Sequence, residues 1–183
     1  MLYDTINEVL LKIKTTKGLI PSGSLIEKYL PVDYSDVYAC EVDSEKEIIP
    51  DDIMVYFWTD FPGWVNVLFK LRNFMVKFVG LKSSEDGNLE EFEKCIRTGG
   101  TYNFASVPIK SNDETILLLT DKHLNAYISV YVESVEEHKK ISAITLVNFN
   151  NRLGRFYFFI IRPFHGAVVK SMLKRAVNKA VQK

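Results

Sequence analysis

The sequence predicts an α+β fold in which a curved antiparallel sheet wraps around a long C-terminal helix, with another helix inserted after the early strands. Short runs of β-branched and aromatic residues follow one another between Tyr102 and Arg162, and only brief breaks separate them. This pattern is typical of an antiparallel meander. Residues Phe164–Val181 then carry apolar side chains at helical spacing,. The sheet and this helix bury their apolar faces together only if the sheet curls around the helix.

The amino-terminal part of the chain is expected to contain the first strands. Residues 1–20 are predicted to form an N-terminal arm or short helix, and residues 21–183 one ligand-binding domain,. A Gly-, Pro- and Ser-rich stretch contains a short helical turn at Ser24–Tyr29,. A first strand is predicted at Tyr34–Val42 and a second at Ile53–Thr59,.

The inserted helix is expected to begin after Pro62, because proline suits the first helical position, and to end at Val79, before Gly80,. Later in the chain, Pro163 is interpreted in the same way, as the start of the C-terminal helix. Four breaks separate the strands of the meander: Ser111–Asp113, Asp121–Lys122, Glu133–Lys139 and Asn150–Arg152.

Composition narrows the class of protein. Aromatic residues make up 13% of the 183 residues, so a core or a cavity must accommodate many rings,. A membrane span needs about 18 consecutive apolar residues, whereas the longest apolar run is Phe156–Ile161. The amino terminus also lacks a basic segment followed by a long apolar one, so we expect a cytoplasmic protein,.

The net charge of zero conceals a polarised chain, because residues 139–183 carry ten Lys or Arg and no Asp or Glu. Such a basic segment can indicate an anionic ligand, a nucleic acid or an acidic membrane, or it can be a solvated helix face. No RNA-binding strand motif accompanies it, so we expect no nucleic-acid partner. The oligomeric state stays open.

Metal and cofactor motifs are missing from the sequence. Cys40 and Cys95 have no metal-ligand spacing, and the three histidines show no paired ligands,. The glycine-rich phosphate-binding and nucleophile motifs are also absent,. We therefore expect neither a metal nor a cofactor, and two buried, reduced thiols.

Arg72 is the least expected residue of the inserted helix. At helical spacing, one stripe of polar residues must face water: Asn66, Lys70, Asn73 and Lys77. Arg72 lies opposite this stripe, among apolar residues. Because a guanidinium keeps its proton, Arg72 needs a carboxylate, backbone carbonyls or a bound anion. It therefore makes either an internal salt bridge, with Asp121, Glu41 or Glu133, or a ligand-facing anion site.

His165 lies on the apolar side of the predicted C-terminal helix, in its first turn. The helix dipole disfavours a charged imidazolium there, which predicts a neutral ring with one donor and one acceptor. Such a group can orient a ligand or act as a general base, or it can be a hydrogen-bonded core histidine.

Further candidates are weaker. Aromatic side chains that could line a pocket, or simply fill the core, are Trp58, Trp64, Tyr131 and Tyr157,. Polar candidates at predicted turns, which turn chemistry alone could explain, are Asp121, His123 and Asn148,.

Several segments, taken in order, resemble the bacterial family catalogued as domain of unknown function 2867. They are Phe61-Pro62-Gly63-Trp64, Leu71-Arg72-Asn73, Val79-Gly80-Leu81-Lys82, Asp121-Lys122-His123-Leu124, Asn151-Arg152-Leu153-Gly154-Arg155-Phe156-Tyr157 and Pro163-Phe164-His165. That family resembles the START-like proteins (helix-grip, polyketide-cyclase-like), which implies a cavity for apolar ligands between sheet and helix. The resemblance implies no known activity.

Three functions are therefore considered. The first is binding of a small hydrophobic or amphipathic molecule, which can also be anionic, with Arg72 meeting an acidic head group and His165 near the mouth. The second is a cyclase or hydrolase-type enzyme in which His165 transfers protons and Arg72 stabilises an oxyanion. The third is peripheral membrane attachment through the basic last helix.

Overall fold

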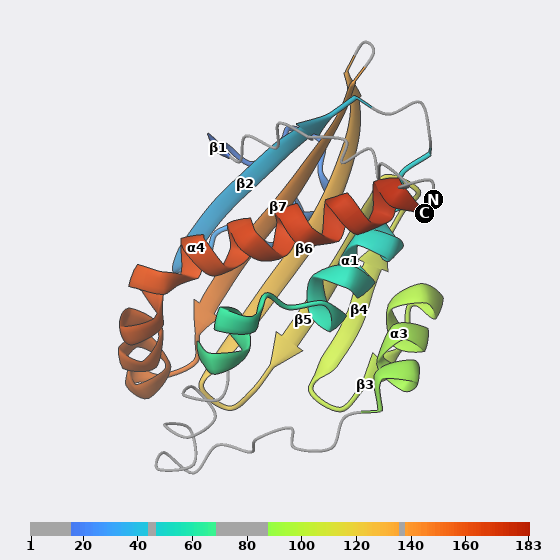
Figure 1. Ribbon diagram of the computed structural model, residues 1–183. Helices are drawn as coiled ribbons and strands as arrows, with labels where there is room; N and C mark the ends of the chain where they lie inside the picture. Colours follow the sequence, from blue (N-terminus) through green and yellow to red (C-terminus); the bar gives the residue numbers. More distant parts are fainter. Residues whose placement is uncertain (1–15, 44–46, 69–87, 136–137) are drawn as a thin grey trace.

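The protein forms a curved antiparallel sheet with α-helices packed on one face and a short helical segment on the other (Figure 1). The computed structural model describes residues 16–43, 47–68, 88–135 and 138–183. Within these ranges the sheet has seven strands in the order β1-β2-β7-β6-β5-β4-β3. The strands are β1 (Thr16–Lys17), β2 (Tyr34–Val42), β3 (Thr101–Tyr102), β4 (Ala105–Lys110), β5 (Glu114–Thr120), β6 (Leu124–Val135) and β7 (His138–Phe149).

The helical elements are η1 (Leu25–Tyr29), α1 (Pro50–Thr59), α3 (Leu89–Thr98) and α4 (Arg152–Gln182), and residues 63–68 are also helical. In Figure 1, α4 runs across the sheet with α1 beside it, while α3 lies near β3 and β4. A curved antiparallel sheet with a long C-terminal helix was predicted, and the structure confirms it.

The first predicted strand is confirmed, because β2 spans Tyr34–Val42. The short helical turn is confirmed as η1. The strands of the meander also end close to the predicted breaks, and each pairs antiparallel with the next.

The second predicted strand is wrong, because Ile53–Thr59 belongs to α1. The β-branched and aromatic residues of this segment suggested a strand, but propensity is a weak constraint. Pro50 occupies the first turn of the helix, where Asp51 and Asp52 also favour the dipole,. Ile53 and Phe57, four residues apart, are both buried on one helical face,.

The predicted start of the last helix is also wrong, because α4 begins at Arg152 and Pro163 lies inside it. Asn151 caps the helix: its Oδ1 accepts hydrogen bonds from the backbone N–H groups of Leu153 and Gly154, each at 3.1 Å,. Proline removes one helical hydrogen bond and commonly bends a helix. Figure 1 shows the first turns of α4 running in a different direction from the rest.

Helix α3 lies in a segment for which no element was predicted. Asn88 caps its start by accepting a hydrogen bond from Glu90 N at 3.0 Å. Gly99 ends it with a φ of 76°, a left-handed conformation that glycine adopts readily,.

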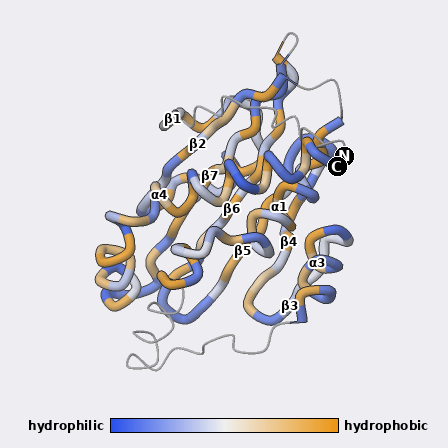
Figure 2. Tube along the Cα trace, viewed as in Figure 1, coloured by the Kyte–Doolittle hydropathy of each residue, from blue (hydrophilic) through white to orange (hydrophobic). Residues whose placement is uncertain are grey.

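The sheet buries apolar residues on both faces, because alternate residues of each strand point in opposite directions. On one face lies the helix-side cluster, formed by the buried apolar residues of α1, α3 and α4 with strand residues that include Cys40, Val42, Leu117, Ile128, Val130, Val132, Ile141 and Ala143. On the other face lies the η1-side cluster: Ile26, Val37, Ile116, Ile144 and Leu146. Figure 2 shows hydrophobic residues along the strands and also in the first turns of α4.

Some predictions concern residues outside the described ranges. They are residues 1–15 of the N-terminal arm predicted at residues 1–20, Arg72 and the rest of the inserted helix beyond Leu68. In the described part of that arm, Thr16–Lys17 form strand β1, which pairs with β2 instead of forming a helix. The predicted beginning of the inserted helix after Pro62 is confirmed by the helical residues 63–68, in which Val65 is buried and Asn66 is exposed.

Candidate functional site

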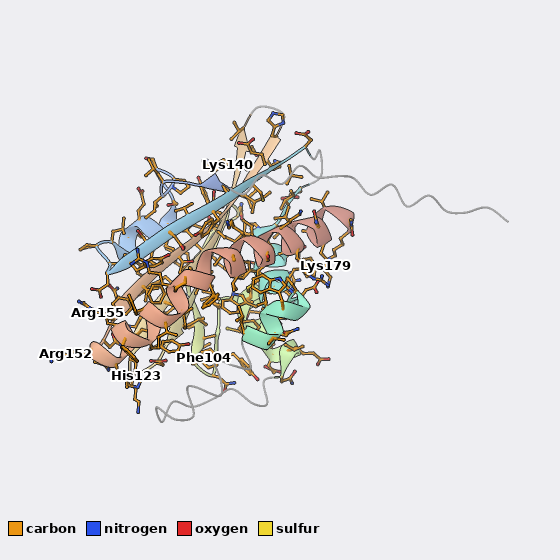
Figure 3. All side chains as sticks on the ribbon, turned by 60° about the vertical axis from the view of Figure 1, so that its left-hand side comes forward. Phe104, His123, Lys140, Arg152, Arg155 and Lys179 are labelled. Carbon is orange, nitrogen blue, oxygen red and sulfur yellow. The ribbon has the colours of Figure 1, made fainter. Side chains whose placement is uncertain are left out.

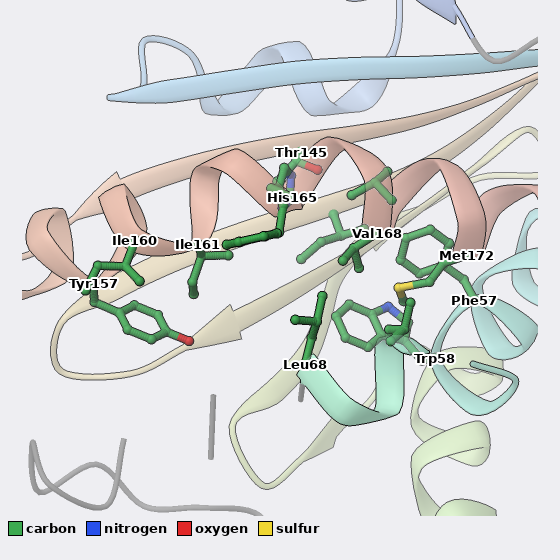
Figure 4. Close-up of a pocket in the computed structure, with 14 residues that line it drawn as sticks. Phe57, Trp58, Leu68, Thr145, Tyr157, Ile160, Ile161, His165, Val168 and Met172 are labelled. Atoms are coloured by element: carbon green, nitrogen blue, oxygen red, sulfur yellow. The ribbon is translucent and has the colours of Figure 1, made fainter. Parts of the chain in front are cut away.

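A cavity of about 290 Å³ lies between α4, the sheet, α1 and the helical residues 63–68 (Figure 4). Most of its wall is apolar: Phe57, Val65, Leu68, Ile128, Ile160, Ile161, Phe164, Val168, Val169 and Met172. The polar groups in the wall belong to Trp58, Thr145, Tyr157 and His165. In Figure 4, Tyr157 lies toward one end, Trp58 toward the other, and His165 with Thr145 between them on the sheet side.

A second cavity of about 200 Å³ adjoins the first. The two share six wall residues: Trp58, Ile128, Thr145, Tyr157, Ile161 and His165. His165 and Thr145 therefore stand where the two cavities meet, and a ligand in either cavity would be close to the same polar groups.

His165 is paired with a buried carboxylate. Its Nε2 lies 3.3 Å from Oδ2 of Asp36 on β2, and the Asp36 side chain is only 1% exposed. The hydroxyl of Tyr34, two residues earlier on the same face of β2, donates to the same oxygen at 2.6 Å,. The ring of His165 also packs edge-on against that of Tyr34, so the imidazole is fixed from two sides.

The surroundings of Asp36 favour its charged form. Burial acts to raise the pKa of Asp36, but the attraction of His165, the hydrogen bond from Tyr34 and the nearby hydroxyl of Thr145 hold it below its ordinary value of 3.8,. Burial and the Asp36 carboxylate raise the pKa of Tyr34 and of Tyr38, so both phenols stay protonated. The site thus holds one buried anion surrounded by donors.

Gly166 allows α4 to approach this group closely. A Cβ at position 166 would collide with the hydroxyl of Tyr38. After burial, the charge of the nearby Asp36 carboxylate is the main cause of the raised pKa of Tyr38. The absence of a side chain next to His165 therefore leaves room for the polar residues of β2.

Four of the predicted candidates line the cavities. His165, Trp58 and Tyr157 line both, and Asp121 lines the second. The carboxylate of Asp121 accepts hydrogen bonds from the backbone N–H groups of His123 (2.5 Å) and Leu124 (3.1 Å), so it also holds the β5–β6 turn,.

Other candidates lie elsewhere. Tyr131 packs in the η1-side cluster, on the opposite face of the sheet, and Asn148 pairs with Asn125 between β6 and β7. His123 is buried, with Nδ1 3.1 Å from Asn151 Oδ1 at the start of α4. Trp64 is 45% exposed, on a helical segment that borders the first cavity through Val65 and Leu68.

Arg72 lies outside the described residues, so its predicted salt bridge with Asp121, Glu41 or Glu133 stays a prediction. Of those partners, Glu133 pairs with Lys140 at 2.9 Å, and Asp121 is engaged in its turn.

Sequence reasoning missed Asp36, Tyr34 and Thr145. A signal for Asp36 was present, because every second residue of a strand lies on the same face. In the predicted strand, one such face carries Tyr34, Asp36, Tyr38, Cys40 and Val42. A carboxylate at the second of these positions needs a partner when that face is buried. Nothing in the sequence indicates that the partner is His165.

Cys40 and Cys95 are buried in the helix-side cluster. Burial, aided by Glu41, raises the pKa of the Cys40 thiol to about 12, and burial raises that of Cys95,. Among the described residues, no three His, Cys, Asp or Glu side chains are grouped to hold a metal ion. No helix in the described ranges is long and apolar enough to cross a bilayer.

Comparisons with curated proteins and with solved structures returned no significant match. Residues 29–172 match a family described as "Protein of unknown function (DUF2867)". This segment includes β2, the meander, the Asp36–His165 pair and most of the cavity wall on α4. The chain therefore belongs to the DUF2867 family.

Proposed function

We propose that the protein binds a small hydrophobic or amphipathic molecule in the cavity beneath α4. The observation that carries the proposal is the cavity itself, whose wall is apolar except for a few polar groups around His165 and Thr145. Small-molecule sites generally combine a concave apolar wall with a few placed polar groups. With the adjoining space of about 200 Å³, there is room for a compact ring system or a short chain.

The ligand is expected to place its polar end against His165 and Thr145. The hydroxyl of Thr145 can donate or accept, and Asp36 fixes the imidazole through Nε2,. A carboxyl or hydroxyl group on the ligand matches these partners, while its apolar body contacts residues such as Ile161 and Met172. That Arg72 meets an acidic head group stays a prediction.

Native mass spectrometry of gently purified protein, compared with its denatured mass, tests this proposal first. An adduct that disappears on denaturation is the expected result. A panel of carboxylic acids and alcohols with short to medium apolar chains should then raise the melting temperature. An empty protein that no member of the panel stabilises would contradict the proposal.

A matched pair of variants on α4 localises binding. Val168 lines the cavity, whereas its neighbour Ala167 is exposed and does not. Val168→Trp should fill the cavity and weaken binding about tenfold or more, and Ala167→Trp should leave it unchanged. Equal affinities for the two variants would place the ligand elsewhere.

The Asp36–His165 pair favours a second candidate, a cyclase or hydrolase-type enzyme. A carboxylate that holds one nitrogen of an imidazole orients the ring so that the other nitrogen can transfer a proton. A substrate with an acidic C–H bond or a carbonyl, held in the cavity, would be the target of this base. The oxyanion role predicted for Arg72 belongs to this candidate.

His165→Asn distinguishes the two candidates. For an enzyme, this variant should lower kcat by about 10²- to 10⁴-fold and keep ligand affinity within a few fold, because proton transfer is lost and the cavity is not. Asp36→Asn should shift the pH profile of kcat/KM. A binding protein without catalysis would lose affinity in both variants and convert none of its ligands.

A further inference from the structure

The first half of α4 exposes large apolar side chains. Phe156, Phe159 and Phe164 are 63%, 71% and 55% exposed, whereas Gly154 and Phe158, on the other side of the helix, are buried. Figure 2 shows this part of α4 as largely hydrophobic. A contiguous apolar surface on a folded protein is typical of an interaction site.

The apolar surface continues around the first cavity. Ile160 and Phe164 line the cavity and are also exposed, at 39% and 55%. Across the cavity, Trp64 (45% exposed) and Val67 (64%) lie on the helical residues 63–68, which line it through Val65 and Leu68. The exposed apolar residues therefore flank the cavity from two elements.

Arginines accompany this surface. Arg152, Arg155 and Arg162 are exposed on the same turns of α4, and no acidic residue occurs anywhere in that helix. Arg155 pairs with Asp33 at 3.2 Å but stays 70% exposed, and the guanidinium of Arg162 lies 5.7 Å from the centroid of the Tyr34 ring. Figure 3 places Arg152 and Arg155 together where α4 begins, with Lys179 toward its other end.

We propose that this surface, here called the docking face and defined by Phe156, Phe159, Arg152 and Arg162, binds the surface of an anionic lipid bilayer. Phenylalanine side chains enter the boundary between head groups and acyl chains, while arginines at the same level pair with lipid phosphates. The charge favours this occupant over a second copy, because a symmetric dimer through this face would bring like-charged arginines together.

The orientation has a consequence for the cavity, which would open toward the membrane through the same face. The inference does not depend on the proposed ligand, because Phe156, Phe159 and the arginines are not part of the cavity wall. Docking and ligand binding can therefore fail separately.

Vesicle flotation tests the proposal. The folded protein should bind vesicles of phosphatidylcholine with phosphatidylserine more tightly than vesicles of phosphatidylcholine alone. The double variant Phe156→Ser, Phe159→Ser should weaken binding about tenfold or more. Its control is Leu19→Ser, which removes another apolar side chain, 92% exposed, away from α4.

The charge contribution has its own pair of variants. Arg152→Gln with Arg162→Gln should weaken binding to anionic vesicles about fivefold for each arginine. The control, Lys28→Gln with Lys94→Gln, removes two exposed charges from η1 and α3 and should change nothing. Circular dichroism confirms that each variant is folded.

Two outcomes would overturn the proposal. One is that the native protein binds neither kind of vesicle, or binds both with equal affinity. The other is a dimer in analytical ultracentrifugation that Phe156→Ser with Phe159→Ser converts to a monomer, without vesicle binding, which would make the face a self-interface. Retention of ligand binding in the phenylalanine variants would show that only docking had been removed.

Discussion

The two faces of the sheet bury their polar groups in different ways. On the η1 side, Glu114 is 1% exposed, and its carboxylate accepts hydrogen bonds from Leu25 N, from Ile26 N at 3.3 Å and from Ser129 Oγ at 2.5 Å. On the helix side, Asp36 is similarly buried, but its partner His165 stands in the wall of two cavities. The carboxylate of Glu114 holds η1 against the sheet, whereas the carboxylate of Asp36 holds His165, a side chain that lines the cavities.

This difference separates a face whose buried carboxylate anchors a segment of chain from the face that carries the proposed ligand site. A buried carboxylate is costly unless hydrogen bonds or an opposite charge compensate for its lost hydration. Glu114 accepts hydrogen bonds mainly from backbone N–H groups of η1, and these bonds anchor η1 to the sheet. Asp36 is surrounded by side chains of Tyr34, Thr145 and His165, and such a constellation is typical of a functional site.

The largest effect is expected for Glu114→Ala. The change leaves two backbone N–H groups and the Ser129 hydroxyl without an acceptor, which should cost about 3 kcal/mol of the free energy of unfolding. Urea denaturation measures it. Glu133→Ala, whose partner Lys140 is partly exposed, is the control and should cost under about 1 kcal/mol,. Equal losses of unfolding free energy in the two variants would contradict the structural role of Glu114. Ligand affinity should change in neither variant.

A smaller effect is expected for Gly166→Ala. The new methyl group would displace the hydroxyl of Tyr38, at a cost of about 2 kcal/mol in denaturation experiments,. Unlike Glu114→Ala, this variant should also weaken ligand binding, because it disturbs the group beside His165. Tyr38→Phe in the same chain should restore part of the stability. A Gly166→Ala protein as stable as the native one would contradict the close contact between α4 at position 166 and the hydroxyl of Tyr38.

The smallest effect concerns acid stability. Because the pKa of Asp36 is lower in the folded than in the unfolded protein, its charge stabilises the fold above its ordinary value of 3.8,. This contribution is lost as the pH falls through the folded pKa. Melting temperatures measured between about pH 2 and pH 7 should therefore fall less steeply on the acid side in Asp36→Asn than in the native protein. Parallel curves for Asp36→Asn and the native protein would refute the prediction.

The sequence predicted the sheet better than the helices. Strand β2 was predicted with its observed limits because it is rich in tyrosine and valine and turn residues bound it,. Ile53–Thr59 and residues 153–162 were assigned to strands because short apolar and aromatic runs do not reveal their period. Local signals in both segments favoured a helix: Pro50 with two following aspartates, and Asn151 as a cap.

The candidate site was predicted only in part. His165, Trp58 and Tyr157 were named, and they lie in one cavity wall. The reasoning that placed His165 in a first helical turn was wrong, since α4 begins at Arg152. Its partner Asp36 comes from the other end of the chain, and only the folding of β2 against α4 brings them together.

Pro163 gives α4 a further property. Tyr157, Ile160 and Ile161 precede the proline, whereas His165, Val168 and Met172 follow it, and all six line the same cavity. The cavity wall on α4 is thus divided between the helical segments before and after Pro163. Because a proline removes one backbone hydrogen bond and commonly bends a helix, the angle between these two segments sets the spacing of the wall residues on either side of Pro163,.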